Sequence, residues 1–419
     1  MSESKVKAPR GTFDVLGADA AARSLLESRA RAILEGAGYE LIETPTFEAT
    51  ELFARGVGAS TDIVRKEMFT FDDAGGRSLT LRPEGTAPVC RAYVEHGMHK
   101  RRQPVKLWYL SSFFRHERAQ AGRYRQFWQV GAEALGSDDP AVDAESIVLL
   151  SSLLAELQVR DVRLRLSSLG SIESRSEYRE RLQEHLRKHE RSLSEDVRSR
   201  IEQNPLRAFD SEHPGTRGVM ESAPRLLEHL SAEDAEHFAQ VSALLDVAGV
   251  SYEVDSTLVR GLDYYTRTVF EFTSDALGAQ SGVGGGGRYD GLVAQLGGPS
   301  TAGMGWAAGV ERIMLAGEAP AAAGAPVELF VALEDDSAEV RMAGFALLTE
   351  ARSAGLAAQM DLGGRSLKGQ LGHAGAIGAR FVAILGAGDT TLRDMQGATQ
   401  ATIATEAVVH SVLRGQHAL

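Results

Sequence analysis

Cysteine is almost absent from this chain: Cys90 is the only one among 419 residues. A single cysteine excludes an intrachain disulfide and every metal site built from several thiolates. Cys90 lies in the run TAPVCRAYVEHG, whose pattern indicates a helix. Because a free cysteine behaves as a small apolar side chain, we expect Cys90 to be a buried structural thiol and not a nucleophile.

Long apolar runs and an excess of positive charge are also missing. No window approaches the roughly 20 consecutive apolar residues of a membrane span, and the N-terminal MSESKVKAPRG lacks the apolar core of a signal peptide. We therefore expect a cytoplasmic location and no membrane partner. Lys and Arg total 45 against 57 Asp and Glu, a net charge of −12. That balance argues against nucleic-acid binding as the sole function but leaves a local basic surface open.

Signatures of metal binding and of a nucleophilic triad are not found. The sequence has no HExxH segment and no Cys/His spacing of a metal site, so no metal held by the protein itself is expected. His96 and His116 stand alone, as structural histidines do. What the chain has is globular composition, with 43% hydrophobic and 24% charged residues, which is enough for a large core.

Hairpin signals dominate the first 325 residues. A helix is predicted over Ala18–Leu34, ended by glycines, and a strand over Tyr39–Glu43. Two strand pairs follow, 67–73 with 77–84 and 105–117 with 125–135. The first pair is joined through Asp73, Gly75 and Gly76, which are typical turn residues. Because hairpins outnumber β-α-β units, we predict an α+β fold: an antiparallel sheet with helices packed on it.

Two further regions differ in pattern. Residues 170–250 are highly charged and helical in pattern, which predicts a helical insertion on the outside of the first region. Its basic residues suit either an RNA contact or a solvated helical face, of which the solvated face is the simpler interpretation.

After a Pro- and Ala-rich linker at 318–326, strands and helices alternate. Residues 326–419 are therefore predicted to form a small α/β domain with a mainly parallel sheet.

The stretch Phe114–Glu133 concentrates arginine in a strand–loop–strand. It holds Arg115, Arg118, Arg123 and Arg125. Guanidinium groups match phosphate oxygens bidentately, so this hairpin suits a polyanion. A surface ion-pair network is the alternative.

A second stretch, LVRGLDYYTRTVFE, carries Arg260 and the paired Tyr264 and Tyr265. Because side chains alternate along a strand, we expect only one of the two tyrosines to line a given pocket.

Two glycine-rich stretches follow. The run GVGGGGRYDG at 282–291 is neither a phosphate-binding P-loop nor a dinucleotide fingerprint. Its glycines indicate close backbone approach to a ligand or a neighbouring strand. The run GMGWAAGVER at 303–312 predicts a strand of small residues that leads into a helix carrying Arg312.

Together and in this order, these segments resemble the class II aminoacyl-tRNA synthetases, and the similarity to the histidyl members covers nearly the whole chain. GYELIETPTFE, with Pro45, is similar to the first motif of that class, FRHERAQAGRYRQF to the second and GMGWAAGVERIML to the third. LRPEGT, LVRGLDYYT and GGRYDGL resemble segments of the histidyl enzymes. The resemblance implies a class II catalytic domain over 1–325, with its helical insertion, and an anticodon-binding domain over 326–419.

The resemblance also implies roles for single residues. The catalytic cations would be Arg115, Arg260 and Arg312. ATP would be bound by Arg115, Arg123 and Arg312. The acceptor end of the tRNA would meet Arg118 and Gln120. Histidine would be bound by Glu84, Gly85, Thr86, Arg115, Gln129, Glu133, Arg260, Tyr264 and Tyr265. Within that set, Glu133 and Tyr265 would read the imidazole.

The implied reaction is activation of L-histidine with ATP and Mg²⁺, release of pyrophosphate, and transfer of histidine to the 3′ end of tRNA(His). The resemblance further implies a homodimer whose interface contains the first motif. The alternative is a non-catalytic, histidine-binding paralogue that regulates a histidine-biosynthetic phosphoribosyltransferase. Such regulators generally lack the C-terminal domain and the catalytic arginines, which this chain has. The sequence departs from the family at Ala119, where proline is common, and at Trp128, where histidine is common.

Overall fold

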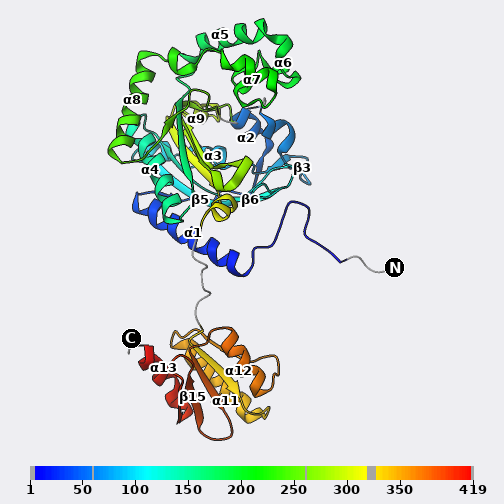
Figure 1. Cartoon of the computed structure of the whole chain (residues 1–419), viewed down its shortest axis with the longest axis vertical. Helices are drawn as coiled ribbons and strands as arrows, with labels where there is room; N and C mark the ends of the chain where they lie inside the picture. The colour runs from blue at the N-terminus through cyan, green and yellow to red at the C-terminus, as the bar shows by residue number, and fades with distance from the viewer. Residues whose placement is uncertain (1–4, 59–60, 260–261, 319–326, 417–419) are drawn as a thin grey trace. The chain divides into compact units, whose positions relative to one another are not determined.

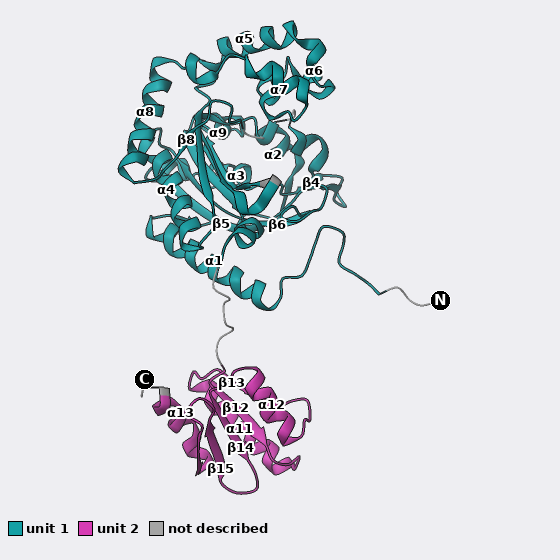
Figure 2. Ribbon diagram, in the orientation of Figure 1, with its two compact units in different colours: residues 1–321 teal, residues 322–419 magenta. Residues whose placement is uncertain are grey.

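The chain forms two compact units, residues 1–321 and 322–419 (Figure 2). The computed structural model describes residues 5–58, 61–259, 262–318 and 327–416. The division lies close to the boundary predicted at residues 325 and 326. The predicted linker falls, from residue 319 onward, outside the described residues.

Unit 1 is built on an eight-stranded sheet (Figure 1). The six central strands pair antiparallel, and the two edge strands pair parallel with their neighbours. In order across the sheet, the strands are β1 (Glu40–Leu41), β5 (Val105–Phe114), β6 (Gln126–Leu135), β11 (Gly303–Gly309), β10 (Gly282–Arg288), β9 (Thr266–Ser274), β7 (Val162–Ser168) and β8 (Glu253–Val254). The predicted antiparallel α+β architecture is confirmed, and so is the hairpin formed by β5 and β6.

Helices cover one face of this sheet. They are α1 (Gly17–Gly36), α4 (Pro140–Glu156) and α8 (Ala232–Val247). Their apolar side chains share one core with Trp108 and Trp306 of the sheet. Because side chains alternate along a strand, Leu107 and Tyr109 belong to the core of the opposite face. That face also carries α3 (Thr86–Glu95) and α9 (Leu292–Gln295), and it is where the cavity described below opens.

Cys90 lies in α3 and is fully buried in the same core. Burial raises the pKa of its thiol well above the ordinary value, which keeps the sulfur protonated and weakly nucleophilic. The prediction of a structural thiol is confirmed.

A three-stranded sheet, ordered β2 (Phe47–Ala49), β4 (Ser78–Leu81), β3 (Thr70–Asp72), lies beside α2 (Thr50–Phe53). The predicted hairpin between β3 and β4 is present. Asp73 makes its turn: Oδ1 accepts hydrogen bonds from the backbone N–H groups of Gly75 at 2.8 Å and Arg77 at 2.9 Å. Gly76 has a φ of 76°, which a side chain disfavours.

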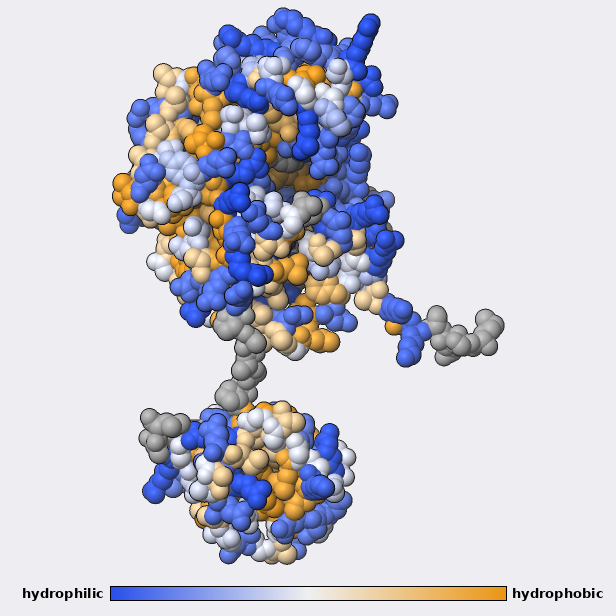
Figure 3. Space-filling view, viewed as in Figure 1, coloured by the Kyte–Doolittle hydropathy of each residue, from blue (hydrophilic) through white to orange (hydrophobic). Residues whose placement is uncertain are grey.

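The insertion begins with α5 (Arg175–Lys188), α6 (Glu195–Arg200) and α7 (Pro214–Glu221), which gather at one end of unit 1 (Figure 1). The surface over these helices is largely hydrophilic (Figure 3), in line with a solvated helical face. The structure differs from the prediction at α8. This helix was expected in the outer subdomain, but its Val241 and Leu245 are fully buried on the sheet beside α4.

Unit 2 has a five-stranded sheet flanked by α11 (Ala338–Ser353), α12 (Leu367–Ala376) and α13 (Val408–Gln416). The strand order is β13 (Ala358–Met360), β12 (Leu329–Leu333), β14 (Phe381–Leu385), β15 (Thr390–Asp394), β16 (Thr399–Ile403). The first three strands are parallel, as predicted, but β15 and β16 add antiparallel pairings. The sheet is therefore mixed, and the prediction of a mainly parallel sheet is wrong for its second half.

Among the residues that the structure describes, no helix combines the length and apolar character needed to cross a membrane.

A fully buried ion pair joins α4 to β10. Asp143 and Arg288 are both 0% exposed, and Arg288 Nη2 lies 2.9 Å from Asp143 Oδ1. Arg288→Met should leave the buried Asp143 carboxylate without its guanidinium, with only Thr268 Oγ1 and the His237 ring beside it, and destabilise unit 1 by about 3–5 kcal/mol. All three tryptophans lie in unit 1, so tryptophan fluorescence during urea unfolding measures this unit alone.

Arg163→Met is the matched control, because Arg163 forms an exposed pair with Asp275 and exposed pairs contribute roughly 0–1 kcal/mol. Equal unfolding midpoints for Arg288→Met and the unsubstituted chain would contradict the expectation.

Candidate active site

A cavity of about 400 Å³ opens on the sheet face opposite α1, α4 and α8. Its walls come from parts of the chain that are far apart in sequence: residues 84–86, the hairpin that joins β5 and β6, residues 262–265, the glycine-rich strands β10 and β11, and the helix α10 (Val310–Ala316). Only the folded sheet brings these segments together.

Three guanidinium groups share this cavity: Arg115, Arg123 and Arg312. Burial and the nearby Arg123 and Arg115 lower the pKa of Arg312, although Glu117 opposes the shift. Backbone carbonyls hold Arg312 in place, with Nε 3.0 Å from the oxygen of Gly122 and Nη1 2.5 Å from the oxygen of Gly282. Clustered, prepositioned arginines of this kind suit the oxygens of a polyphosphate.

The glycines of β10 provide a flat wall beside these arginines. Gly282, Gly284 and Gly285 line the cavity. A Cβ added to Gly284 would lie 2.6 Å from the Cβ of Ala308 on the neighbouring strand β11, which is closer than real atoms approach. The close backbone approach predicted for this run is confirmed, and the neighbour is the strand β11.

A different set of groups lines another part of the cavity. Glu84 is 4% exposed, and its carboxylate accepts the N–H groups of Thr86 at 2.8 Å and Ala87 at 3.0 Å at the start of α3. Gln129 Oε1 is buried and has no hydrogen-bond partner among the described residues. An unpaired buried acceptor is costly, so a carboxylate and an amide oxygen at one cavity are suited to an ammonium group.

Arg115 lies between the two sets. Its Nε donates to the carbonyl oxygen of Pro83 at 2.9 Å, directly before Glu84. Burial raises the pKa of Glu84, while hydrogen bonds at the start of α3 and the positive charge of Arg115 oppose the shift. Because Arg115 also lowers the pKa of Arg312, it is close to both ends of the cavity.

Tyr264 and Tyr265 both line the cavity. The prediction that only one of them would do so is wrong. It assumed that the two residues lie in a strand, but β9 begins at Thr266 and the tyrosines precede it. Without strand alternation their rings lie 4.7 Å apart, centroid to centroid.

Glu133 lies behind the cavity wall and is fully buried. Its Oε1 accepts from Thr86 Oγ1 at 2.7 Å and its Oε2 from the hydroxyl of Tyr289 at 2.6 Å. Burial raises the pKa of Glu133 to about 8, although the hydrogen bonds from Tyr289 and Thr86 oppose the shift.

The predicted site residues therefore fall into three groups. Those that line the cavity are Glu84, Gly85, Thr86, Arg115, Arg123, Gln129, Tyr264, Tyr265 and Arg312. Glu133 lies directly behind, and the exposed Arg118 and Gln120 lie on the loop between β5 and β6, outside the lining. Arg260 falls outside the described residues.

Sequence reasoning missed Tyr109 and Glu271, which both line the cavity. Tyr109 pairs with Gly131 in the hairpin, and a Cβ at Gly131 would lie 2.4 Å from the tyrosine ring. A glycine opposite an aromatic residue could have indicated that Tyr109 lines the cavity. That pairing can be recognised only once the register between β5 and β6 is known.

Trp128, where the family commonly has histidine, points away from the cavity. The guanidinium carbon of Arg23 lies 3.3 Å from the centroid of its ring, a cation–π contact between α1 and the sheet. The backbone N–H of Trp128, which any residue but proline would supply at this position, donates to both carboxylate oxygens of Glu311 at 3.1 Å. The substitution thus affects packing behind the site and not its lining.

An antiparallel sheet that carries arginines from a β-hairpin and from a following strand–helix unit, around one cavity that also holds a buried carboxylate, is the arrangement of the class II aminoacyl-tRNA synthetases. A family model described as histidyl-tRNA synthetase matches residues 11–313. The chain belongs to the histidyl-tRNA synthetase family.

Relatives and solved structures agree with this assignment. A protein of Desulforamulus reducens named histidine–tRNA ligase is 46% identical over 411 residues, covering 96% of this chain and 97% of that protein. A protein of the same name from Halorhodospira halophila is 48% identical over 405 residues, 95% of each chain. The crystal structure of apo S. aureus histidyl-tRNA synthetase matches with a TM-score of 0.82 at 34% identity, covering 97% of this chain and 100% of that one.

The raised pKa of Glu133 makes a testable contribution to stability. Its folded-state pKa of about 8 lies above the ordinary value of 4.5, so the folded protein binds the proton more tightly than the unfolded chain. Stability therefore falls as pH rises from about 5 to about 8. Glu133→Gln keeps the shape and cannot ionise, so it should lose less stability over this range.

The measurement is thermal unfolding of both proteins without ligands at several pH values. The melting temperature of Glu133→Gln minus that of the unsubstituted chain should become more positive with rising pH. A constant or falling difference would show that Glu133 is ionised throughout.

Proposed function

We infer that this chain is a histidine–tRNA ligase, which activates L-histidine with ATP to histidyl-adenylate and then transfers histidine to the 3′ end of tRNA(His). One observation carries the inference: Arg115 lines the same cavity as Arg312 and Glu84, and it donates a hydrogen bond to the carbonyl directly before Glu84. A phosphate held by the cations and an amino acid held by Glu84 would meet at this residue. Family membership supplies the identity of the amino acid.

In the first step the histidine carboxylate attacks the α-phosphate of ATP and pyrophosphate leaves. The attacking carboxylate is already ionised near neutral pH, so no strong base is required. Both partners are anionic, and the protein must align them and stabilise the charge that grows on the α-phosphate. We propose that Arg115 contacts the α-phosphate and Arg312 the γ-phosphate, with Arg123 contributing to nucleotide binding.

Magnesium is proposed to enter the same cavity with ATP, in line with the expectation that the protein alone holds no metal. Mg²⁺ is usually held by substrate phosphates and one or two carboxylates. Glu117 and Glu271 line the cavity, and the Glu271 carboxylate is close enough to affect the pKa of Arg312. Glu117, now paired with Arg123, and Glu271, now paired with Arg165, would be the protein's contribution to holding the ion beside ATP. The ion would supply positive charge that neutralises the phosphates.

Histidine is proposed to bind with its amino group at Glu84, Thr86 and Gln129, and with its ring at Tyr265 and Glu133. Support comes from the unpaired Oε1 of Gln129 and from the high pKa of Glu133. A site built to hydrogen-bond an imidazole leaves polar groups unpaired with other amino acids and can reject them by roughly 10⁴–10⁵.

Gly85 is also part of this surface. Its position has no room for a side chain. A Cβ added to Gly85 would lie 2.4 Å from the ring of Tyr109. Arg260 is proposed, on the resemblance alone, to lie beside the histidine carboxylate and the α-phosphate.

Contacts with tRNA are proposed at two places. Arg118 and Gln120 are exposed on the loop between β5 and β6, where they can meet the acceptor end. Unit 2 is proposed as the anticodon-binding domain, which its separate core and helix-flanked sheet permit. A cytoplasmic location follows from the proposed substrates.

A homodimer is proposed through the surface of the first motif. Leu41 is 50% exposed, Phe47 51% and Phe71 44%. Phe47 and Phe71 contact each other edge to face on the small sheet. Exposed aromatic side chains of this kind are enriched in protein–protein interfaces.

The regulatory-paralogue alternative is less well supported. A solved structure titled as an ATP phosphoribosyltransferase regulatory subunit/histidyl-tRNA synthetase from Bacillus halodurans C shares the fold at 23% identity and a TM-score of 0.63. The relatives at 46% and 48% identity carry the ligase name. The converging Arg115 and Arg312 favour the ligase.

Histidine-dependent exchange of pyrophosphate into ATP tests the ligase proposal. The purified chain should show exchange with histidine and with none of the other nineteen amino acids. Arg312→Met should lower the turnover number by about 10²–10³, because it removes a preplaced cation from the phosphates.

The matched control is Arg29→Met, whose guanidinium makes an exposed pair with Glu156 on α1 and α4. Binding of histidine without any exchange by the unsubstituted chain would favour the regulatory function.

Removal of residues 326–419 tests the role of unit 2. Because this unit has its own core, unit 1 should still form the adenylate, and exchange should fall by less than about fivefold. Transfer to tRNA should fall far more, on the order of 10²-fold or greater, as expected when one of two linked binding surfaces is lost. Equal losses in both assays would show that unit 2 only stabilises unit 1.

A further inference from the structure

Arg175, the first residue of α5, reaches from the insertion to the backbone of the amino-acid pocket. Its Nη2 donates to the carbonyl oxygen of Tyr265 at 2.9 Å, and Tyr265 lines the cavity. Burial and the neighbouring Arg179 lower the pKa of Arg175 to about 10, so the group is still charged at neutral pH. Hydrogen bonds from a charged donor are stronger than neutral ones.

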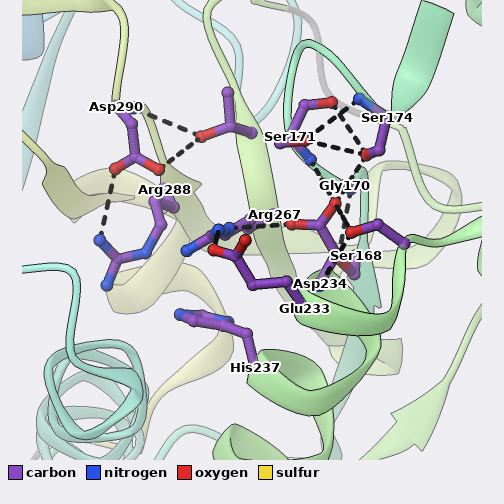
Figure 4. Close-up of polar contacts among 12 residues, drawn as sticks. Ser168, Gly170, Ser171, Ser174, Glu233, Asp234, His237, Arg267, Arg288 and Asp290 are labelled. Carbon is purple, nitrogen blue, oxygen red and sulfur yellow. Dashed lines mark hydrogen bonds and ion pairs between the residues drawn. The ribbon is translucent and has the colours of Figure 1, made fainter.

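Asp234, near the start of α8, connects the same region from the other arm of the insertion (Figure 4). The residue is 1% exposed. Its Oδ2 accepts from the Ser171 N–H at 3.0 Å and from Ser174 Oγ at 2.6 Å, and its Oδ1 from Arg267 Nε at 2.9 Å. The Asp234 carboxylate therefore links α8 to the first residues of the insertion and to Arg267 of β9. Arg267 lies two residues after Tyr265.

This carboxylate stays ionised in the folded protein. Burial alone would raise the pKa of Asp234, but hydrogen bonds from Ser171, Ser174, Ser231 and Arg267 outweigh burial and lower the pKa to about 2. The ionised carboxylate therefore accepts all of these hydrogen bonds at any pH at which the protein would be assayed.

The backbone of Arg267 depends on this network. Its φ is 41°, a value that residues with side chains disfavour. The Arg267 N–H donates to the carbonyl of Gly170 at 2.8 Å, and the Leu169 N–H donates to the carbonyl of Arg267 at 2.6 Å. Strained conformations persist only where the surroundings hold them, and here the first residues of the insertion do so.

Two more contacts tie the insertion to the borders of the pocket. Arg200 of α6 pairs with Asp62, Nη2 to Oδ1 at 2.9 Å, next to a residue that lines the cavity. Asn204 Nδ2 donates to Asp263 Oδ1 at 2.8 Å, directly before Tyr264. The segment that carries both pocket tyrosines is therefore bound to the insertion through backbone and side chains.

We propose that Arg175 is a positioning residue for histidine: through the Tyr265 carbonyl it makes the shape of the amino-acid pocket depend on how the insertion is seated on β9. The proposal rests on the proposed function for the identity of the ligand. Loss of the contact releases the Tyr264–Tyr265 segment and weakens histidine binding. The nucleotide end is unaffected, because the carbonyls of Gly122 and Gly282 hold Arg312 separately.

Arg175→Met tests this, because methionine keeps much of the apolar stem and donates no hydrogen bond. The Kd of histidine, measured by calorimetry, and the KM for histidine in exchange should both rise about tenfold, as expected for loss of a charged hydrogen bond. The KM for ATP should change by less than about twofold. Arg175→Lys should fall between the two proteins, since an ammonium can still donate.

The matched control is Arg181→Met on the same helix, where the guanidinium is exposed and pairs with Glu177. It should bind histidine as the unsubstituted chain does. Combining Arg175→Met with Asp234→Asn should raise the histidine Kd by less than the product of the two single effects, because both act on one segment.

Several results would overturn the proposal. One is an unchanged histidine Kd in Arg175→Met at an unchanged melting temperature. Another is an equal loss of histidine and ATP binding, which would show general loosening. If Arg175→Met does not fold, Arg175→Lys decides by the same comparison. A chain that binds histidine but does not exchange pyrophosphate would refute the ligase function, while the effect of Arg175 on the histidine Kd would still be measurable.

Discussion

Mutual repulsion among three guanidinium groups is the constraint that the site has to satisfy. Arg115, Arg123 and Arg312 share one cavity, and burial together with the charges of the other two arginines lowers the pKa of Arg312. The fold offsets the repulsion with fixed acceptors: backbone carbonyls of residues 83, 122 and 282 and the carboxylate of Glu117. These acceptors come from separate loops and strands, so the sheet that aligns them is part of the binding site and not only its support.

Much of unit 1 could be predicted because its signals are local. The Asp73 turn, the paired strands around residue 120 and the run of small residues before Arg312 each depend on neighbours in sequence. The predicted lining residues were found in one cavity for a different reason. They were assigned by resemblance, and nothing in their spacing would have placed Glu84 beside Arg115.

The errors have physical causes in tertiary structure. The prediction for Tyr264 and Tyr265 assumed that their side chains alternate along a strand. The pairing of β9 with β7 and β10 begins only after these two residues. Polar composition placed α8 in an outer lobe, although a few apolar residues such as Val241 and Leu245 were enough to dock it on the sheet. In unit 2, β16 has four exposed residues of five, so the second half of that sheet lacked the apolar signal that marked β12 and β14.

The isolated, fully buried thiol of Cys90 has a practical consequence. With its pKa raised by burial and no other sulfhydryl in the chain, the native protein presents no reactive background to maleimide reagents. A cysteine introduced at one exposed position in each unit would accept a fluorophore without prior removal of a natural one. Energy transfer between two such dyes could then follow the separation of units 1 and 2 in solution.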